Sequence, residues 1–139
     1  MSANVDLVRK TYEAFARGDI DTVLAGFAED IEWIEPAGYF AGAGGVRGRA
    51  AVAEVFGEYP KFWSELSVTP DRFLEAGDEW VIVTGDQRGI ARETGNEYRG
   101  RVCNVWQIRD GQAVRLEVFT DTGLMWKAFG RLPPDAERA

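Results

Sequence analysis

The chain begins with a stretch in which apolar residues return every three or four positions, the period of an amphipathic helix. This spacing joins Val5, Val8, Tyr12 and Phe15 and predicts a helix over about residues 4–17. A helix of this kind buries one face and leaves the other in water. Tyr12 and Phe15 are therefore expected on the buried side.

Gly18 ends this helix, and Asp19 has a side chain suited to cap a second one. The second helix is predicted to carry four apolar residues at the same period: Ile20, Val23, Leu24 and Phe27. A third helix is predicted over about residues 49–58, with Pro60 just beyond its end.

One short strand is predicted between the second and third helices, over residues 31–35. It stops there because Pro36 has no N–H with which to continue a ladder of hydrogen bonds. Residues 37–48 hold five glycines, which is typical of a mobile loop.

In the second half of the chain the hydrophobic period changes from near 3.6 to 2, which indicates strands. Four are predicted, with turns marked by Gly77-Asp78, Thr94-Gly95-Asn96 and Asp110-Gly111: 66–76, 79–90, 97–109 and 113–120. A short helix around 122–129 follows. The whole indicates one α+β domain over residues 1–132, with a curved antiparallel sheet against helices and a flexible tail at 133–139.

Composition narrows the function. The 139 residues are 45% hydrophobic with five tryptophans, which favours a folded domain with an aromatic interior or cavity. A formal charge of −7 argues against nucleic acid and anionic membranes as partners. There is no apolar run long enough for a membrane span and no signal-peptide pattern, and a lone Cys103 fits a reducing compartment, so a cytoplasmic location is expected.

Histidine is absent from the sequence, which removes the usual partner of a catalytic serine or cysteine and the commonest metal ligand. With a single cysteine besides, no metal site is expected. Any chemistry must use carboxylates, tyrosine, arginine, amides or water, and no cofactor is expected.

Glu35 is the first candidate for such chemistry. It follows the apolar and aromatic run 31–34, and burial there would raise the pKa of its carboxyl and suit it to proton transfer near neutral pH. The alternative is a solvated charge at a strand end.

Asn104 and Asp121 are the other two candidates. Alternation places Asn104 between Val102 and Trp106 on one face of a strand, where its amide could donate to a developing oxyanion or be satisfied structurally. Asp121 closes the last strand, where it could act as an acid or base at a pocket rim or cap the short helix that follows.

The glycine-rich stretch Gly42–Gly48 lacks the Lys-Ser/Thr ending and the strand–helix context of a phosphate loop, so a flap beside a pocket is the better interpretation. Six aromatic residues are expected to line that pocket, with ordinary core packing as the alternative for Tyr12 and Trp33: Tyr12, Phe15, Trp33, Tyr39, Phe56 and Trp106. The polar face that holds Glu97, Arg99 and Arg101 is expected to be solvated.

The run from Val8 to Asp30, with Trp33-Ile-Glu35-Pro36, Val105-Trp106-Gln-Ile-Arg-Asp110-Gly111 and Phe119-Thr-Asp121, resembles the nuclear transport factor 2-like superfamily. The likeness is to its SnoaL-type polyketide cyclase and ketosteroid isomerase branch. It implies a cystatin-like cone, in the order α-α-β-α-β-β-β-β, around an apolar cavity, commonly in a homodimer.

By this resemblance the isomerase general base falls on Glu35, the oxyanion-hole acid falls on Asn104, and the helix-one tyrosine donor falls near Thr11, with Tyr12 adjacent. The pocket aspartate of the cyclases matches Asp121 most closely. The Arg-x-Asp part of limonene epoxide hydrolases falls on residues 102–104, where neither charged residue is present.

The expected function is a cofactor-free isomerase or cyclase that transfers a proton on a small, largely apolar carbonyl compound. The alternatives are a non-catalytic module for small-molecule binding or dimerisation, and a small subunit of a ring-hydroxylating dioxygenase.

Overall fold

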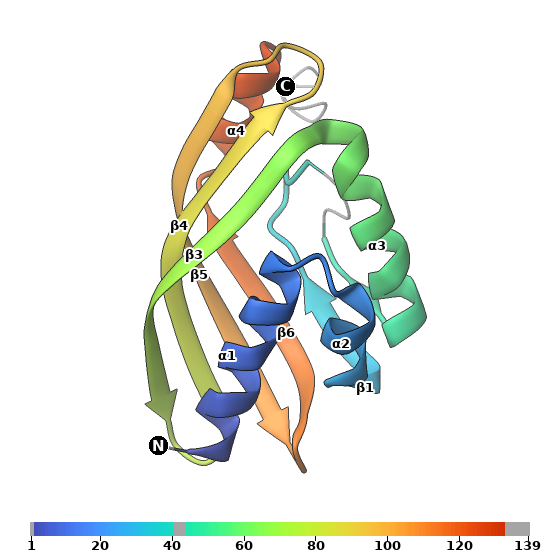
Figure 1. The fold of residues 1–139 in the computed structure, drawn as a ribbon, viewed down its shortest axis with the longest axis vertical. Helices are drawn as coiled ribbons and strands as arrows, with labels where there is room; N and C mark the ends of the chain where they lie inside the picture. Colours follow the sequence, from blue (N-terminus) through green and yellow to red (C-terminus); the bar gives the residue numbers. More distant parts are fainter. Residues whose placement is uncertain (1, 41–43, 133–139) are drawn as a thin grey trace.

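A curved sheet of six strands forms one wall of the molecule, and three helices lie against one of its faces (Figure 1). The computed structural model describes residues 2–40 and 44–132. The helices are α1 (Ala3–Ala16), α2 (Ile20–Ala25), α3 (Arg49–Phe62) and α4 (Thr122–Phe129). The strands are β1 (Phe27–Ile34), β2 (Val46–Arg47), β3 (Trp63–Ala76), β4 (Trp80–Ala91), β5 (Glu97–Arg109) and β6 (Gln112–Thr120).

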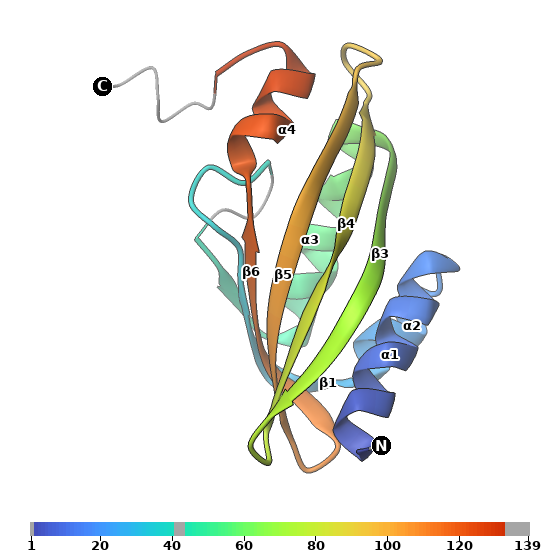
Figure 2. The same cartoon turned by 90° about the vertical axis from the view of Figure 1, so that its left-hand side faces the viewer.

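The strand order in the sheet is β2-β1-β6-β5-β4-β3. Strands β3 to β6 form the predicted antiparallel meander, and β1 pairs parallel to β6, with Trp33 opposite Leu116. This α+β cone with a short C-terminal helix is the fold expected from the sequence. Figure 2 shows α1 and α2 beside the lower part of the sheet and α4 at its upper end.

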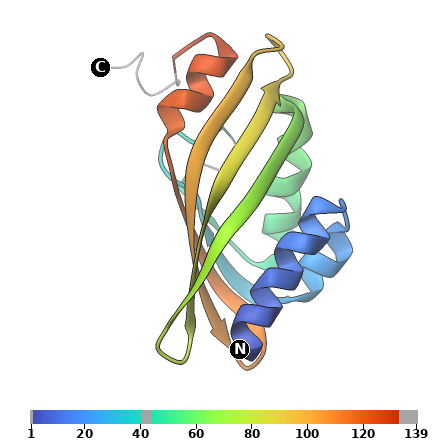
Figure 3. The same cartoon turned by 60° about the vertical axis from the view of Figure 1, so that its left-hand side comes forward.

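The core lies between the sheet and helices α1 to α3. In β5 the buried residues alternate as predicted, with Val102, Asn104, Trp106 and Ile108 turned inward. The other face of β3, β4 and β5 is free of helices in the described part of the chain (Figure 3). One face of the sheet therefore packs against the helices, and the other faces solvent.

The structure differs from the sequence-based expectation in three places. Phe27 begins β1 rather than continuing the second helix, and it packs against Trp33 and Trp106 at ring distances of 5.6 and 6.0 Å. Helix α3 runs on to Phe62, with Pro60 inside it.

The extra turn of α3 is held by packing. The ring of Phe40 lies 5.0 Å from Tyr59 and 5.6 Å from Phe62, and the carbonyl of Pro60 accepts a hydrogen bond from Arg92. Tertiary contacts therefore outweigh the cost of a proline near a helix end.

The third difference is in the glycine-rich segment 37–48, which contains the short strand β2, paired with Glu32 and Trp33 of β1. Tyr39 and Phe40 in this segment are buried. Residues 41–43, and the predicted tail at 133–139, lie outside the described residues.

Across residues 2–40 and 44–132, each helix falls short of the length and apolar character that crossing a membrane requires.

Candidate active site

A cavity of about 170 Å³ lies between the inner face of the sheet and helices α1 and α3. The six aromatic residues expected to line a pocket all lie in its wall: Tyr12, Phe15, Trp33, Tyr39, Phe56 and Trp106. Ala16 and Ser67 also line it and are exposed, which places its mouth between the end of α1 and β3. A cavity of roughly 150 Å³ can hold a benzene molecule, so this one is large enough for a single small ring.

Glu35 lies on the inner side of the chain just past the end of β1. Ile31, Trp33 and Glu35 alternate inward, and Glu35 is only 1% exposed. Burial raises the pKa of its carboxyl from 4.5 to about 7, although a hydrogen bond from Tyr59 opposes part of that rise. Near neutral pH the Glu35 carboxyl is therefore protonated in part of the molecules and ionised in the rest.

Glu35 is joined to the cavity through Tyr59. The Tyr59 hydroxyl donates to Glu35 Oε2 at 2.8 Å, and Tyr59 lines the cavity while Glu35 lies behind it. The second oxygen, Oε1, is buried and has no hydrogen-bond partner in the described structure. Burial also raises the pKa of Tyr59, so this hydroxyl stays protonated. Tyr59 was not singled out from the sequence, since it lies in the part of α3 beyond the predicted helix end.

Three side chains form a second polar cluster in the cavity wall: Tyr12, Asn104 and Trp106. The Tyr12 hydroxyl oxygen accepts hydrogen bonds from Asn104 Nδ2 at 2.6 Å and from Trp106 Nε1 at 3.1 Å. With both N–H groups pointed at its oxygen, the Tyr12 hydroxyl is free to donate its own hydrogen to a ligand. Burial raises the pKa of Tyr12 to about 12, so it remains a donor.

Of the two neighbouring residues matched to the helix-one tyrosine, Tyr12 contacts the buried polar side chains of the cavity and Thr11 does not. Thr11 lies on the cavity wall, but its hydroxyl donates back to the carbonyl of Leu7 in the same helix. Asn104 was predicted either to donate to an oxyanion or to be satisfied structurally. Its amide nitrogen contacts Tyr12, and its buried Oδ1 has no partner within the described residues.

A third polar side chain, Gln87 of β4, faces the cavity and is only 4% exposed. Its Oε1 accepts from the Tyr98 hydroxyl at 3.1 Å, and its Nε2 lies 3.5 Å from the hydroxyl of Tyr39. The sequence did not single out Gln87, because its neighbours Asp86 and Arg88 are charged and face outward.

Asp121 does not reach this site. It is exposed, and its carboxylate caps α4 by accepting from the backbone N–H of Leu124 at 3.3 Å. The capping alternative considered for Asp121 is therefore the one the geometry shows. The described residues also hold no cluster of three acidic, cysteine or histidine side chains that could bind a metal ion.

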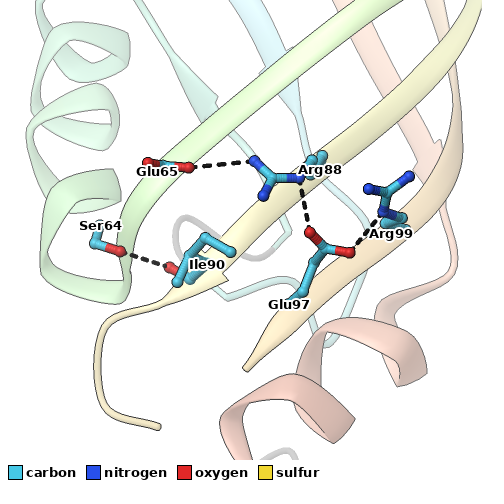
Figure 4. Close-up of polar contacts among 6 residues, drawn as sticks. All are labelled: Ser64, Glu65, Arg88, Ile90, Glu97 and Arg99. Carbon is cyan, nitrogen blue, oxygen red and sulfur yellow. Dashed lines mark hydrogen bonds and ion pairs between the residues drawn. The ribbon is translucent and has the colours of Figure 1, made fainter. Parts of the chain in front are cut away.

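The outer face of the sheet carries ion pairs between exposed side chains (Figure 4). Arg88 lies 2.8 Å from Glu97 and 3.2 Å from Glu65, and Arg99 lies 2.6 Å from Glu97. Arg101 pairs with Asp71 and Asp86 on the same face. These are solvated ion pairs, as expected for this face, and they do not line the cavity.

Comparison with known proteins gives consistent results. The SnoaL-like domain model matches residues 8–116. An uncharacterized protein of Mycobacterium tuberculosis, Rv0034, is 45% identical over 118 residues, which cover 84% of this chain and 88% of the relative.

Two solved structures share nearly the whole fold. A nuclear transport factor 2-like protein of Burkholderia pseudomallei is 34% identical with a TM-score of 0.86, covering 92% of this chain and 98% of that one. TerC, co-crystallised with polyporic acid, is 27% identical with a TM-score of 0.85, covering 93% of this chain and 99% of that one. The chain therefore belongs to the SnoaL-like domain family, within the nuclear transport factor 2-like superfamily.

Proposed function

We propose that this protein is a cofactor-free acid–base catalyst, of the isomerase or cyclase type, for a small and largely apolar carbonyl compound. The observation that carries this proposal is a buried carboxyl, Glu35, with a pKa near 7, joined by the Tyr59 hydroxyl to an apolar cavity. A general base works best when its pKa lies near the working pH.

Glu35 acts through Tyr59, because Tyr59 is the one of the two that lines the cavity. As the Tyr59 oxygen takes a proton from a carbon next to the substrate carbonyl, its own hydroxyl proton passes to Glu35 Oε2. The electron pair of the broken C–H bond becomes part of the enolate. Reversal at another carbon returns the proton and completes an isomerisation. Because the pKa of Tyr59 is raised, Tyr59 is protonated both before and after the transfer, and Glu35 is the group that gains the proton.

Tyr12 supplies the electrophilic contact. Its hydroxyl, polarised by the N–H groups of Asn104 and Trp106, donates to a ligand oxygen and stabilises the negative charge that develops there. Asn104 thus acts by positioning Tyr12 rather than by touching the substrate. The rings of Trp33, Phe56 and Trp106 exclude water and strengthen these contacts.

TerC supports a ligand-binding use of this fold, since it was co-crystallised with polyporic acid. A non-catalytic binding module remains the second candidate. Within the described residues, the Tyr12 hydroxyl is hydrogen-bonded to the neutral side chains of Asn104 and Trp106 and to no acidic side chain. The lack of an acidic donor at this point favours the binding module.

The test is solvent-deuterium exchange into the α-carbons of cyclohexanone, followed by NMR. The wild type should exchange the ketone faster than buffer, and Glu35→Gln and Tyr59→Phe should each lower that rate by about 10²- to 10⁴-fold. Glu32→Gln is the matched control. Glu32 lies in β1, three residues before Glu35, and it pairs with Arg47 at 3.1 Å, away from the cavity.

Exchange that survives in Glu35→Gln would contradict the role of Glu35. Exchange that is lost in Glu35→Gln but retained in Tyr59→Phe would contradict the relay. A wild type that exchanges no faster than buffer would favour the binding module.

A further inference from the structure

Gln87 is a buried amide whose presence the acid–base chemistry does not explain. It projects from β4 into the cavity with an exposed fraction of 4%. Burying an amide costs free energy unless its donors and its acceptor form hydrogen bonds.

The oxygen end of Gln87 is fixed. Tyr98, on the neighbouring strand β5, donates to Oε1 at 3.1 Å, and the hydroxyl of Thr120 lies 3.2 Å from that of Tyr98. With Oε1 held this way, the NH₂ group is the end left to the cavity. Its nearest partner is the Tyr39 hydroxyl at 3.5 Å, the far limit of a hydrogen bond.

The fold makes room for the tyrosine that holds Gln87. A Cβ on Gly100 would lie 2.6 Å from the Tyr98 hydroxyl, and a Cβ on Gly89 would lie 2.6 Å from the ring of Trp63. Trp63 in turn packs on Tyr98 with ring centroids 5.5 Å apart. Two glycines therefore allow a rigid support behind the Gln87 amide.

The two polar ends of the cavity are separated along the sheet. Asn104 pairs with Val83, which lies four residues before Gln87 on the same inner face of β4. Four residues of strand span about 13 Å along the backbone. The Tyr12 and Gln87 ends are therefore different places along the cavity, and a ligand that contacts both needs one oxygen for each.

We propose that Gln87 is a second ligand-binding group, and that the cavity takes a small ring with two acceptor oxygens, one bound by Tyr12 and the other by Gln87. This inference rests on the proposed function for the location of the ligand, while its test reads binding alone.

The second oxygen would lie close to the proton-transfer pair. Tyr39 contacts Gln87, and after burial the charge of Glu35 is the next cause that raises the pKa of Tyr39. Gln87 would thus hold the end of the ring that lies away from Tyr12.

The experiment compares cyclohexane-1,4-dione with cyclohexanone by calorimetric or NMR titration. The wild type should bind the dione about three- to tenfold more tightly, as expected for one additional neutral hydrogen bond. Gln87→Leu should remove this preference and leave the affinity for cyclohexanone within about twofold of the wild type.

Tyr98→Phe is the second variant and decides the outcome if Gln87→Leu fails to fold. It keeps Gln87 but frees its amide, so the preference should fall while binding of cyclohexanone persists. An equal preference in wild type and Gln87→Leu, or no preference in the wild type, would overturn the proposal. So would tighter binding of cyclohexane-1,4-diol than of the dione, since Gln87 would then present its oxygen.

Glu35→Gln separates this inference from the proposed function. It should retain the preference for the dione even though it loses deuterium exchange. A preference that disappears in Gln87→Leu while exchange is absent from the wild type would support the ligand class and reject the chemistry.

Discussion

Polar side chains are buried on the inner face of the sheet and exposed to solvent on its outer face. Gln87 and Arg88 are consecutive residues of β4, yet Gln87 is buried in the cavity and Arg88 lies in an ion-pair network on the outer face. On the inner face, burial raises the pKa of Glu35 to about 7. On the outer face, hydrogen bonds from Arg101 and Thr84 lower the pKa of Asp71 to about 2.

Access of water explains the difference. Outer carboxylates keep their solvent and gain arginine partners, so their charged form is favoured and their interactions are weak in energy. Inner groups lose solvent and have few partners, and both Glu35 Oε1 and Asn104 Oδ1 are unpaired within the described residues. Burial without partners therefore moves the pKa of a carboxyl toward neutral pH, whereas pairing with arginine at the surface moves it away.

The largest expected contrast is in activity. Tyr12→Phe should lower deuterium exchange into cyclohexanone by about 10²- to 10³-fold, because it removes the donor to the developing oxyanion. Arg101→Ala, which breaks the outer pairs with Asp71 and Asp86, should leave the rate within about twofold. Equal losses in the two variants would mean that the inner face has no special part in the reaction.

A pH titration of stability should show the next largest effect. The pKa of Glu35 is higher in the folded protein than its ordinary value of 4.5, so its contribution is fully present below pH 4.5 and is lost as the pH rises to about 7. At about 1.4 kcal/mol for each pKa unit, the loss is about 3 kcal/mol.

Urea unfolding at several pH values tests this. Glu35→Gln should lack the decline between pH 4.5 and 7 that the wild type shows. Asp71 and Glu79, whose pKa values are lowered to about 2, act in the opposite sense: their stabilisation is lost as the pH falls toward 2. Parallel curves for wild type and Glu35→Gln would contradict the buried setting of Glu35.

The support behind Gln87 predicts a smaller change in stability. Gly100→Ala would force a Cβ against the buried Tyr98 ring and should destabilise the protein by about 1–3 kcal/mol in thermal or urea unfolding. Gly57→Ala in α3 is the control, because a Cβ at Gly57 meets no atom within 4 Å. It should stabilise the helix by about 0.5–1 kcal/mol. A neutral or stabilising effect of Gly100→Ala would mean that Tyr98 has room to move.

The smallest effect belongs to the outer network. Arg88→Ala removes contacts to Glu65 and Glu97 but should change the free energy of unfolding by less than about 1 kcal/mol. The difference from the wild type should shrink further in 1 M salt, where exposed charges are screened. A loss of several kcal/mol that persists in high salt would show that this face is not solvated as described.

Local patterns predicted most of the fold. The alternation in β5 and the turn at Asp110-Gly111 come from short-range rules that the packed structure keeps. The errors arose where distant contacts decide the local conformation. Phe27 joins β1 because its ring packs between tryptophans, and α3 passes Pro60 because Phe40 holds its last turn.

The candidate site was predictable in part. Glu35 could be located because aromatic neighbours and a following proline surround it in sequence. Tyr59 and Gln87 could not, since each reaches the cavity through partners from other elements, and nothing adjacent in the chain marks them. Asp121 sits at a strand end as expected, but the backbone of α4 takes up its carboxylate.

The parallel pairing of β1 with β6 bears on when the site comes into being. Trp33, which precedes the buried carboxyl by two residues, is matched with Leu116, 83 residues later. Contacts of such high sequence separation form late, because a long loop must close before they are rewarded. On the ribosome, the first half of the chain would hold the acidic group without its enclosure. The carboxyl would be enclosed only once the last strand had emerged and docked, so a chain terminated before β6 would leave Glu35 in contact with water.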